Sequence, residues 1–177
     1  MVAGHGCGCG AGEGWCARLT AYVGVVGPGC GATELQLAVA EQVGTLIAQQ
    51  GHVVVTGGMG GVMESACRAA AAAGGMTVGL LPGTDRAQGN RYLTVAIATG
   101  LGEMRNPLLV RACDVIVCVG TSWGSLSEVA FAMRTGVPVV VVGSLDIPGM
   151  DGPVTTTSPA EAVPIAVALA SQRPSAG

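Results

Sequence analysis

The stretch 104–128 holds two side chains of opposite charge, Arg105 near its start and Glu128 at its end. Between them an apolar run, 114–119, precedes a glycine-bearing loop, 120–124, and a helical pattern follows that loop. A buried strand, a glycine loop and a helix start, in that order, place free backbone N–H groups at the carboxyl edge of a parallel sheet. Anions bind at such helix starts, so this stretch predicts an anion-binding site.

A second glycine loop, 57–61, follows the short apolar run 52–55 and precedes the helical pattern that begins at Val62. Glycines permit positive φ and let a phosphate approach the backbone, while the helix start contributes its positive dipole end. The loop does not match the GxGxxG fingerprint closely, and no acidic residue ends the next strand, which disfavours NAD. The chain also lacks a GxxxxGK[ST] loop, which argues against ATP hydrolysis. A glycine-rich turn that binds nothing is the alternative.

The candidate residues of the first stretch also have structural explanations. Ser125 and Glu128 have the spacing of a capping box, in which the carboxylate reaches back to the entrance of its own helix. Arg105 precedes a short helical segment, where an arginine is usually exposed on the surface. Trp123 could stack on a base or pack in a dimer interface. The residues alone leave these alternatives open.

Short apolar runs alternate with helical patterns along the chain, which predicts an α/β fold with a doubly wound parallel sheet and right-handed crossovers, as in Rossmann-like proteins. The expected strands cover residues 21–26, 52–55, 77–81, 92–97, 114–119 and 137–142. The expected helices begin near Thr33, Val62, Asn106, Ser125 and Pro159. Capping boxes are expected where Thr33 meets Gln36 and where Ser158 meets Glu161, and residues 147–157 are expected to form a loop.

Length and composition indicate one globular domain, 20–177, behind a Gly- and Cys-rich tail, 1–19, that we expect to be flexible. Only 3% of the residues are aromatic, so the core must consist of closely packed Val, Leu, Ile and Ala. The net charge of −3 and the absence of a basic cluster disfavour a nucleic-acid partner. No apolar run approaches the roughly 18–20 residues that would span a membrane, and no secretory signal is visible, so we expect a cytoplasmic protein.

The seven cysteines are irregularly spaced, which fits reduced thiols better than a disulfide framework. His5, Cys7, Cys9 and Cys16 could ligate a metal in principle, but their spacing matches no standard zinc pattern. We therefore expect no metal site.

Residues 22–143 resemble the Lonely Guy family, the cytokinin riboside 5′-monophosphate phosphoribohydrolases. The family's GGGxxGLMG motif corresponds to TGGMGGVME here, and its MxxRK and PGGxGTxxE motifs correspond to MRN and VGTSWGSLSE. Arg105 and Glu128 have the separation of the family's arginine and glutamate. Thr121 stands in place of the last glycine of PGG, and Asn106 in place of the lysine. Two segments, TGLGEMRN and AMRTGVPVV, are more similar to a sister branch of the family. That branch comprises Rossmann-like proteins and includes the molybdenum-cofactor carrier of algae.

The resemblance implies that the phosphate of a nucleoside monophosphate lies on a loop near the Arg105–Glu128 pair, with the second glycine loop as the facing wall. The implied phosphate-binding and nucleotide-binding residues are Gly27, Gly57, Gly58, Gly60, Gly61, Gly120, Thr121, Gly124 and Ser125. Glu128 would stabilise an oxocarbenium-like ribose or activate water, and Arg105 would orient the phosphate or hold Glu128 ionised. No cofactor is implied. A homodimer is expected, with Ala130, Ala132 and Met133 as its seam.

The first hypothesis is therefore a hydrolase that cleaves the N-glycosidic bond of a nucleoside monophosphate to free base and ribose 5-phosphate. The alternative is a non-enzymatic carrier or sensor of the molybdenum cofactor or of a nucleotide. A dimeric scaffold in which both glycine loops are only turns is a third possibility.

Overall fold

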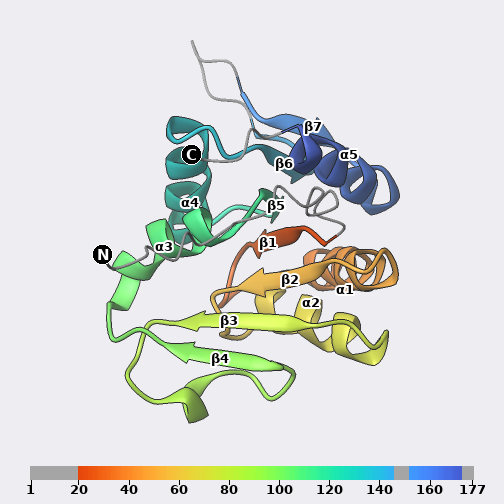
Figure 1. The fold of residues 1–177 in the computed structure, drawn as a ribbon. Helices are drawn as coiled ribbons and strands as arrows, with labels where there is room; N and C mark the ends of the chain where they lie inside the picture. The colour runs from red at the N-terminus through yellow and green to blue at the C-terminus, as the bar shows by residue number, and fades with distance from the viewer. Residues whose placement is uncertain (1–19, 146–151, 173–177) are drawn as a thin grey trace, which may run out of the picture.

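The computed structural model describes residues 20–145 and 152–172, which form one seven-stranded parallel sheet with helices on both faces (Figure 1). The strand order is β4-β3-β2-β1-β5-β6-β7. The strands are β1 Tyr22–Val26, β2 Val53–Thr56, β3 Thr77–Leu81, β4 Val95–Ala98, β5 Val115–Val119, β6 Val139–Val142 and β7 Val154–Thr156. The predicted doubly wound, Rossmann-like fold in a single domain is confirmed.

Two helical layers cover the sheet. Figure 1 shows α3 and α4 on one side and α1 and α5 on the other, where α2 packs against α1. The helices are α1 Glu34–Gln49, α2 Val62–Ala72, α3 Arg105–Ala112, α4 Trp123–Arg134 and α5 Pro159–Ser171, with short 3₁₀ turns at Arg86–Gln88 and Gly102–Met104. Within the described ranges, no helix has both the length and the apolar character needed to cross a bilayer.

The central strands are apolar because both of their faces are covered. Every residue of β2, β5 and β6 is buried, and β1 pairs in register with both of its neighbours, Val23 lying opposite Val54 and Val115. With almost no aromatic side chains available, small residues bring the layers together. A Cβ at Gly44 in α1 would collide with the backbone carbonyl of Ala66 in α2, so these helices touch through their main chains.

The chain reverses its direction across the sheet between β1 and β5. From β1 the chain builds β2, β3 and β4 outward on one side, and then returns to add β5, β6 and β7 on the other. Consequently α1 and α4, which follow the two adjacent strands, lie on opposite faces. A crevice outside the carboxyl ends of the strands at such a reversal is where open α/β sheets bind ligands.

Several local predictions were wrong. The strand expected over 92–97 is displaced to Val95–Ala98, because 90–94 form a turn in which the backbone N–H of Leu93 donates to the carbonyl of Asn90. The loop expected over 147–157 contains β7, which adds a parallel edge strand to β6.

The two capping boxes had different outcomes. The box of Thr33 and Gln36 is present in full. Ser158, by contrast, makes no side-chain cap bond, and the backbone N–H of Glu161 donates to the carbonyl of Ser158 over 3.1 Å. The carboxylate of Glu161 accepts a hydrogen bond of 2.7 Å from the hydroxyl of Thr156, so the reciprocal half of the box is also missing. The predicted tail, 1–19, lies outside the described residues.

Candidate functional site

The loops after β1 and β2 interlock at the carboxyl edge of the sheet. The backbone N–H of Val62 donates to the carbonyl of Pro28 over 3.1 Å, and a Cβ at Gly61 would collide with that same carbonyl. Gly27 is equally constrained, since a Cβ there would collide with the carbonyl oxygen of Val119 at the end of β5. The glycines of both loops therefore permit close backbone contact between three neighbouring strand ends.

The second glycine loop is also held from its other side. Gly58 has φ of 73°, and its N–H donates to the hydroxyl of Thr56 over 3.0 Å. Asn90 binds two carbonyls of the loop: its backbone N–H donates to Gly58 over 2.8 Å and its side chain donates to Met59 over 3.2 Å. Sequence reasoning missed Thr56 and Asn90. Asn90 carries no local signal because it acts from a segment that follows β3.

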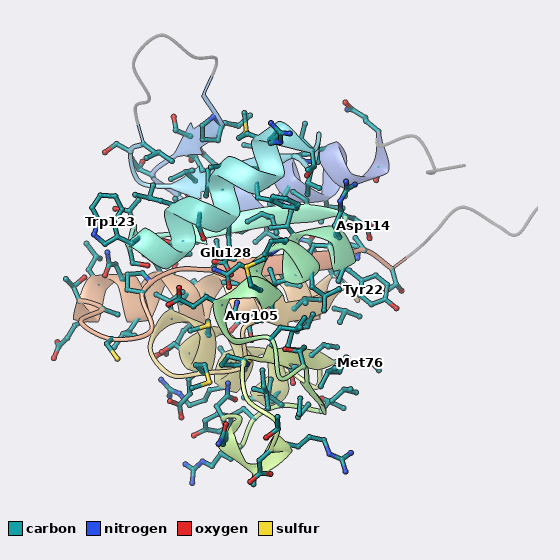
Figure 2. All side chains as sticks on the ribbon, turned by 90° about the vertical axis from the view of Figure 1, so that its left-hand side faces the viewer. Tyr22, Met76, Arg105, Asp114, Trp123 and Glu128 are labelled. Carbon is teal, nitrogen blue, oxygen red and sulfur yellow. The ribbon has the colours of Figure 1, made fainter. Side chains whose placement is uncertain are left out.

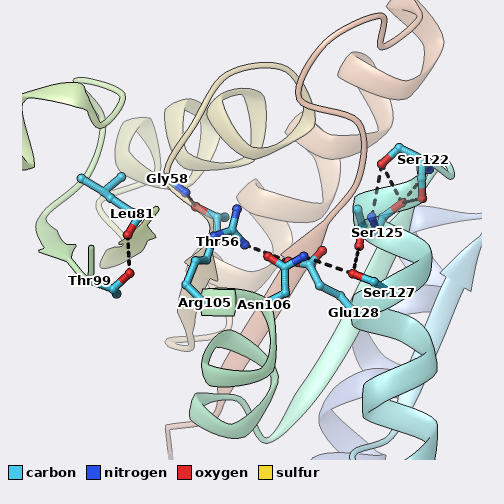
Figure 3. Close-up of polar contacts among 11 residues, drawn as sticks. Thr56, Gly58, Leu81, Thr99, Arg105, Asn106, Ser122, Ser125, Ser127 and Glu128 are labelled. Carbon is cyan, nitrogen blue, oxygen red and sulfur yellow. Dashed lines mark hydrogen bonds and ion pairs between the residues drawn. The ribbon is translucent and has the colours of Figure 1, made fainter. Parts of the chain in front are cut away.

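Arg105 and Glu128 meet as a buried ion pair. Arg105 begins α3, Glu128 lies in the second turn of α4, and the guanidinium Nη1 donates to the carboxylate Oε1 over 2.9 Å (Figure 3). Their side chains are 11% and 8% exposed. The explanation of Arg105 as an exposed surface residue is therefore wrong. A carboxylate and a guanidinium from two helices now stand together at the carboxyl edge, next to the second glycine loop.

Burial dominates the protonation of the pair. Loss of solvent raises the pKa of Glu128 to about 7, and the charge and hydrogen bond of Arg105 offset only part of that rise. The Nε atom of Arg105 is buried without a hydrogen-bond partner in the described part of the chain. Its guanidinium lies against Gly57, where a Cβ would collide with it. The pair is therefore desolvated, and Glu128 is the member whose charge changes near neutral pH.

A second polar bridge joins the same two helices. The amide of Asn106 donates to the hydroxyl of Ser127 over 3.1 Å, and that hydroxyl donates to the carbonyl of Gly124 over 2.7 Å (Figure 3). Asn106 occupies the position where the Lonely Guy motif has a lysine. Here this position links α3 to the first turn of α4 instead of supplying a cation.

The start of α4 is capped by serines, which corrects the expected box of Ser125 and Glu128. Ser122 is the N-cap, its hydroxyl accepts from the N–H of Ser125 over 3.2 Å, and the hydroxyl of Ser125 accepts from the N–H of Ser122 over 2.7 Å. The helix consequently begins at Trp123, earlier than expected. Glu128 is free of the cap because Ser125 takes the reciprocal position, and it bonds Arg105 instead.

The cap also changes what the predicted phosphate loop can offer. Ser125 is buried, and both its N–H and its hydroxyl are already engaged with Ser122. A Cβ at Gly124 would make only an ordinary contact, with the hydroxyl of Ser122 at 3.7 Å. Trp123 is 91% exposed and points away from the molecule (Figure 2), so both of its predicted roles, base stacking and interface packing, stay predictions.

Gly120 and Thr121 face a cavity of about 460 Å³ on the α1 side of the sheet. Its lining comes from the first turns of α1, the ends of β5 and β6 and the segment after β7: Thr33, Leu35, Gln36, Val39, Val119, Gly120, Thr121, Val141, Val142, Gly143, Ser144 and Thr157. A larger groove, of about 790 Å³, lies between α1 and α2 and is lined mainly by alanines and the exposed Arg68–Glu41 ion pair. Because the larger groove lies on the outer helical layer, the smaller cavity is the one at the ligand-binding edge.

The predicted site residues thus fall into two groups on opposite faces of the β5 end. Arg105, Glu128 and Gly57 lie together on one side, and Gly120 and Thr121 line the cavity on the other. Within residues 20–145 and 152–172, no group of three His, Cys, Asp or Glu side chains is placed to hold a metal ion.

Comparison with known proteins identifies the family. The model of the SLOG cluster4 family matches residues 20–169. The chain belongs to the SLOG cluster4 family. An uncharacterized protein of Archaeoglobus fulgidus is 38% identical over 128 residues, which cover 68% of this chain and 83% of that protein.

Two solved structures of similar proteins extend over nearly the whole SLOG domain. The molybdenum cofactor binding protein of the phototrophic bacterium Rippkaea orientalis is 34% identical, with a TM-score of 0.79, over 85% of this chain and 97% of that one. The Moco carrier protein of Chlamydomonas reinhardtii is 32% identical, with a TM-score of 0.76, over 87% and 99%. DNA processing protein A of Helicobacter pylori, at 15% identity and a TM-score of 0.64, shares the fold alone.

These similarities confirm the resemblance to the branch that includes the molybdenum-cofactor carrier. They favour the alternative, a non-enzymatic cofactor carrier, over the phosphoribohydrolase that was our first hypothesis.

Proposed function

We propose that this protein binds and carries the molybdenum cofactor, a phosphorylated pterin, without converting it. The observation that carries the proposal is the similarity, at 34% and 32% identity over 85% and 87% of the chain, to proteins described as binding or carrying that cofactor. A carrier releases the cofactor unchanged, so the protein must hold it at a surface from which it can be released.

The residues at the carboxyl edge suit such a ligand. Three glycine loops lie at the ends of adjacent strands, Arg105 is the buried cation beneath one of them, and the cavity beside Gly120 is within the range of about 300–1,000 Å³ that small-molecule sites occupy. A phosphorylated heterocycle needs an anion-binding surface and a concave apolar surface close together. The cavity beside Gly120 supports the second requirement, and the glycine loops near Arg105 are the proposed place for the first.

The geometry of Glu128 favours carriage over glycosidic cleavage. A carboxylate that stabilises an oxocarbenium-like ribose must face the sugar, whereas this one is 8% exposed and bonded to Arg105. Burial also raises the pKa of Glu128 to about 7, which reduces the ionised fraction at neutral pH. The pair therefore serves better as a support beneath the loops than as a reacting group.

The test is recovery of intact ligand. The protein is purified from cells that make the molybdenum cofactor and from cells that cannot, then molybdenum is measured by mass spectrometry and the released pterin by fluorescence. We expect both in near-equal amounts in the first preparation only. In parallel, AMP and N6-substituted AMP are incubated with wild type and with Glu128→Gln. Base release that depends on Glu128, without retained cofactor, would restore the phosphoribohydrolase hypothesis.

The protein is further proposed to act in the cytoplasm as a homodimer, and the expected seam on α4 loses one of its three residues. Ala132 is fully buried in the core, so only Ala130 and Met133 of the expected seam are exposed on α4. Size-exclusion chromatography with light scattering tests the dimer directly, and a mass of one chain would contradict it.

A further inference from the structure

The cavity beside Gly120 has an apolar floor and a polar, uncharged rim. Val119, Val141 and Val142 at the ends of β5 and β6 form the floor, with Leu35 and Val39 of α1 as one wall. The rim carries hydroxyl and amide side chains, those of Thr33, Gln36, Thr121, Ser144 and Thr157. Among the described residues, none that lines the cavity is charged. A ligand group that fills it must be mostly apolar and must offer hydrogen-bonding edges.

An anion is disfavoured in this cavity although the start of α1 adjoins it. The capping box already engages the backbone N–H groups of Thr33 and Gln36, and Glu34 adds a negative charge in the first turn. With no cation in the lining, only a few backbone N–H groups would compensate a phosphate for its lost hydration. The cavity therefore suits the uncharged part of a ligand.

Gln36 is placed to donate a hydrogen bond to the uncharged part of a ligand in the cavity. Its Oε1 accepts from the N–H of Thr33 over 2.9 Å, and its amide lies against Gly120, where an ideal Cβ would stand 2.7 Å from the side-chain Cδ. Within the described part of the chain, the Nε2 group has no hydrogen-bond partner. Gly120 itself has φ of 70°, a backbone conformation that glycine adopts most readily. The hydrogen bond from Thr33 therefore holds the Gln36 side chain at the rim of the cavity, and the NH₂ group stays available to donate to a ligand.

We propose that this cavity holds the flat, uncharged heterocycle of the ligand, a pterin-like ring, with the amide of Gln36 donating to an acceptor on the edge of the ring. The proposal rests on the proposed carrier function and specifies which surface takes which part of the cargo. The phosphorylated end then lies outside the cavity, toward the second glycine loop, 57–61.

The variants separate this role from the structural role of Gln36. Gln36→Glu keeps a side-chain acceptor at the third helical position, so the capping box survives, but it replaces the donor with an acceptor. Ser144→Trp fills the rim from an exposed position outside the core. Gln42→Glu makes the same charge change on an exposed residue of α1 that does not line this cavity, and it is the matched control. The melting temperature of each variant shows that it is folded.

Binding of 6-hydroxymethylpterin is followed by quenching of its fluorescence, with inorganic phosphate as a competitor, and cofactor retention is measured on the same four proteins. We expect Gln36→Glu to weaken pterin binding by about tenfold, the loss of one well-placed hydrogen bond. Ser144→Trp should abolish binding, and Gln42→Glu should bind as wild type does. Phosphate alone should not displace the pterin.

The two proposals fail in different ways. Suppose that wild type retains the cofactor, and that Gln36→Glu and Ser144→Trp retain it and bind pterin as well as wild type does. The cavity assignment is then wrong and the carrier function stands. If the pterin pattern is as expected but no preparation retains cofactor, the carrier function is wrong and the cavity assignment stands. Displacement of pterin by phosphate, or no binding of pterin to wild type, overturns the cavity assignment.

Discussion

The guanidinium group of Arg105 lies against the Cα atom of Gly57, in the place that a Cβ would occupy. Arg105 comes from α3 and Gly57 follows β2, so this contact joins the helical layer to the second glycine loop. On its other side the guanidinium holds Glu128 of α4 over 2.9 Å. The buried side chain of Arg105 thus connects α3, α4 and the second glycine loop. Its position depends on the absence of a side chain at Gly57.

Gly57→Ala should therefore destabilise the protein by about 1–3 kcal/mol, the usual cost of forcing extra atoms into a packed site. Chemical denaturation measures the change. If the contact with Arg105 is the cause, the penalty should shrink in an Arg105→Met background, with a coupling energy of about 0.5–3 kcal/mol. Gly124→Ala is the matched control, because a Cβ there would meet only the Ser122 hydroxyl at an ordinary 3.7 Å, and it should be neutral or slightly stabilising. Equal penalties in both backgrounds would contradict the assignment.

The stability of the protein should depend on the charge of Glu128. Burial raises its pKa from the ordinary value of 4.5 to about 7, so between these values the folded state holds a proton that the unfolded chain releases. Stability from this group is therefore present below about pH 4.5 and is lost as pH rises toward 7.

Glu128→Gln keeps an oxygen acceptor for Arg105 but cannot titrate, so it isolates this effect. The difference in free energy of unfolding between variant and wild type should grow in favour of the variant from pH 5.5 to 8, by on the order of 1–3 kcal/mol. Urea denaturation at several pH values measures it. Parallel stability curves for the two proteins would show that Glu128 does not change its protonation in this range.

The three N-cap residues of the α-helices that carry a hydroxyl, Thr33, Ser122 and Ser158, should differ in their contribution to stability. Thr33 and Ser122 each accept a backbone N–H of the following helix, whereas Ser158 makes no side-chain cap bond. Replacement of either of the first two by alanine should cost about 0.5–2 kcal/mol. Ser158→Ala should change the melting temperature little. A loss at Ser158 equal to the other two would mean that its hydroxyl caps α5 in solution.

The four described cysteines should react very differently with an alkylating reagent. Cys30 is exposed, whereas Cys67, Cys113 and Cys118 are buried. Burial raises the pKa of Cys67, and it raises the pKa of Cys118 to about 12, so neither provides a thiolate at pH 8. Iodoacetamide labelling mapped by mass spectrometry should modify Cys30 in the native protein and the other three only after unfolding. Native labelling of Cys118 would indicate opening of the β5 end.

Interactions between residues close in the chain were predictable from the sequence. The box of Thr33 and Gln36 was predicted because both partners lie within one helical turn. The apolar strands at 52–55 and 114–119 were predicted because burial on both faces demands an uninterrupted run, and their alternation with helices indicated the parallel sheet. Local rules failed where two patterns competed. The sequence between Ser122 and Glu128 contains overlapping capping boxes, and propensity does not choose between them.

The sequence by itself determined the fold class, the glycine loops and the identity of the charged residues, because composition, periodicity and local hydrogen bonds specify them. Only the tertiary structure decided that Arg105 and Glu128 are a buried pair, that Asn90 holds the second loop, and that Gln36 borders a cavity with the ends of β5 and β6. The reason is physical: desolvation and close contact depend on which elements lie side by side, and that follows from the order of the strands in the sheet.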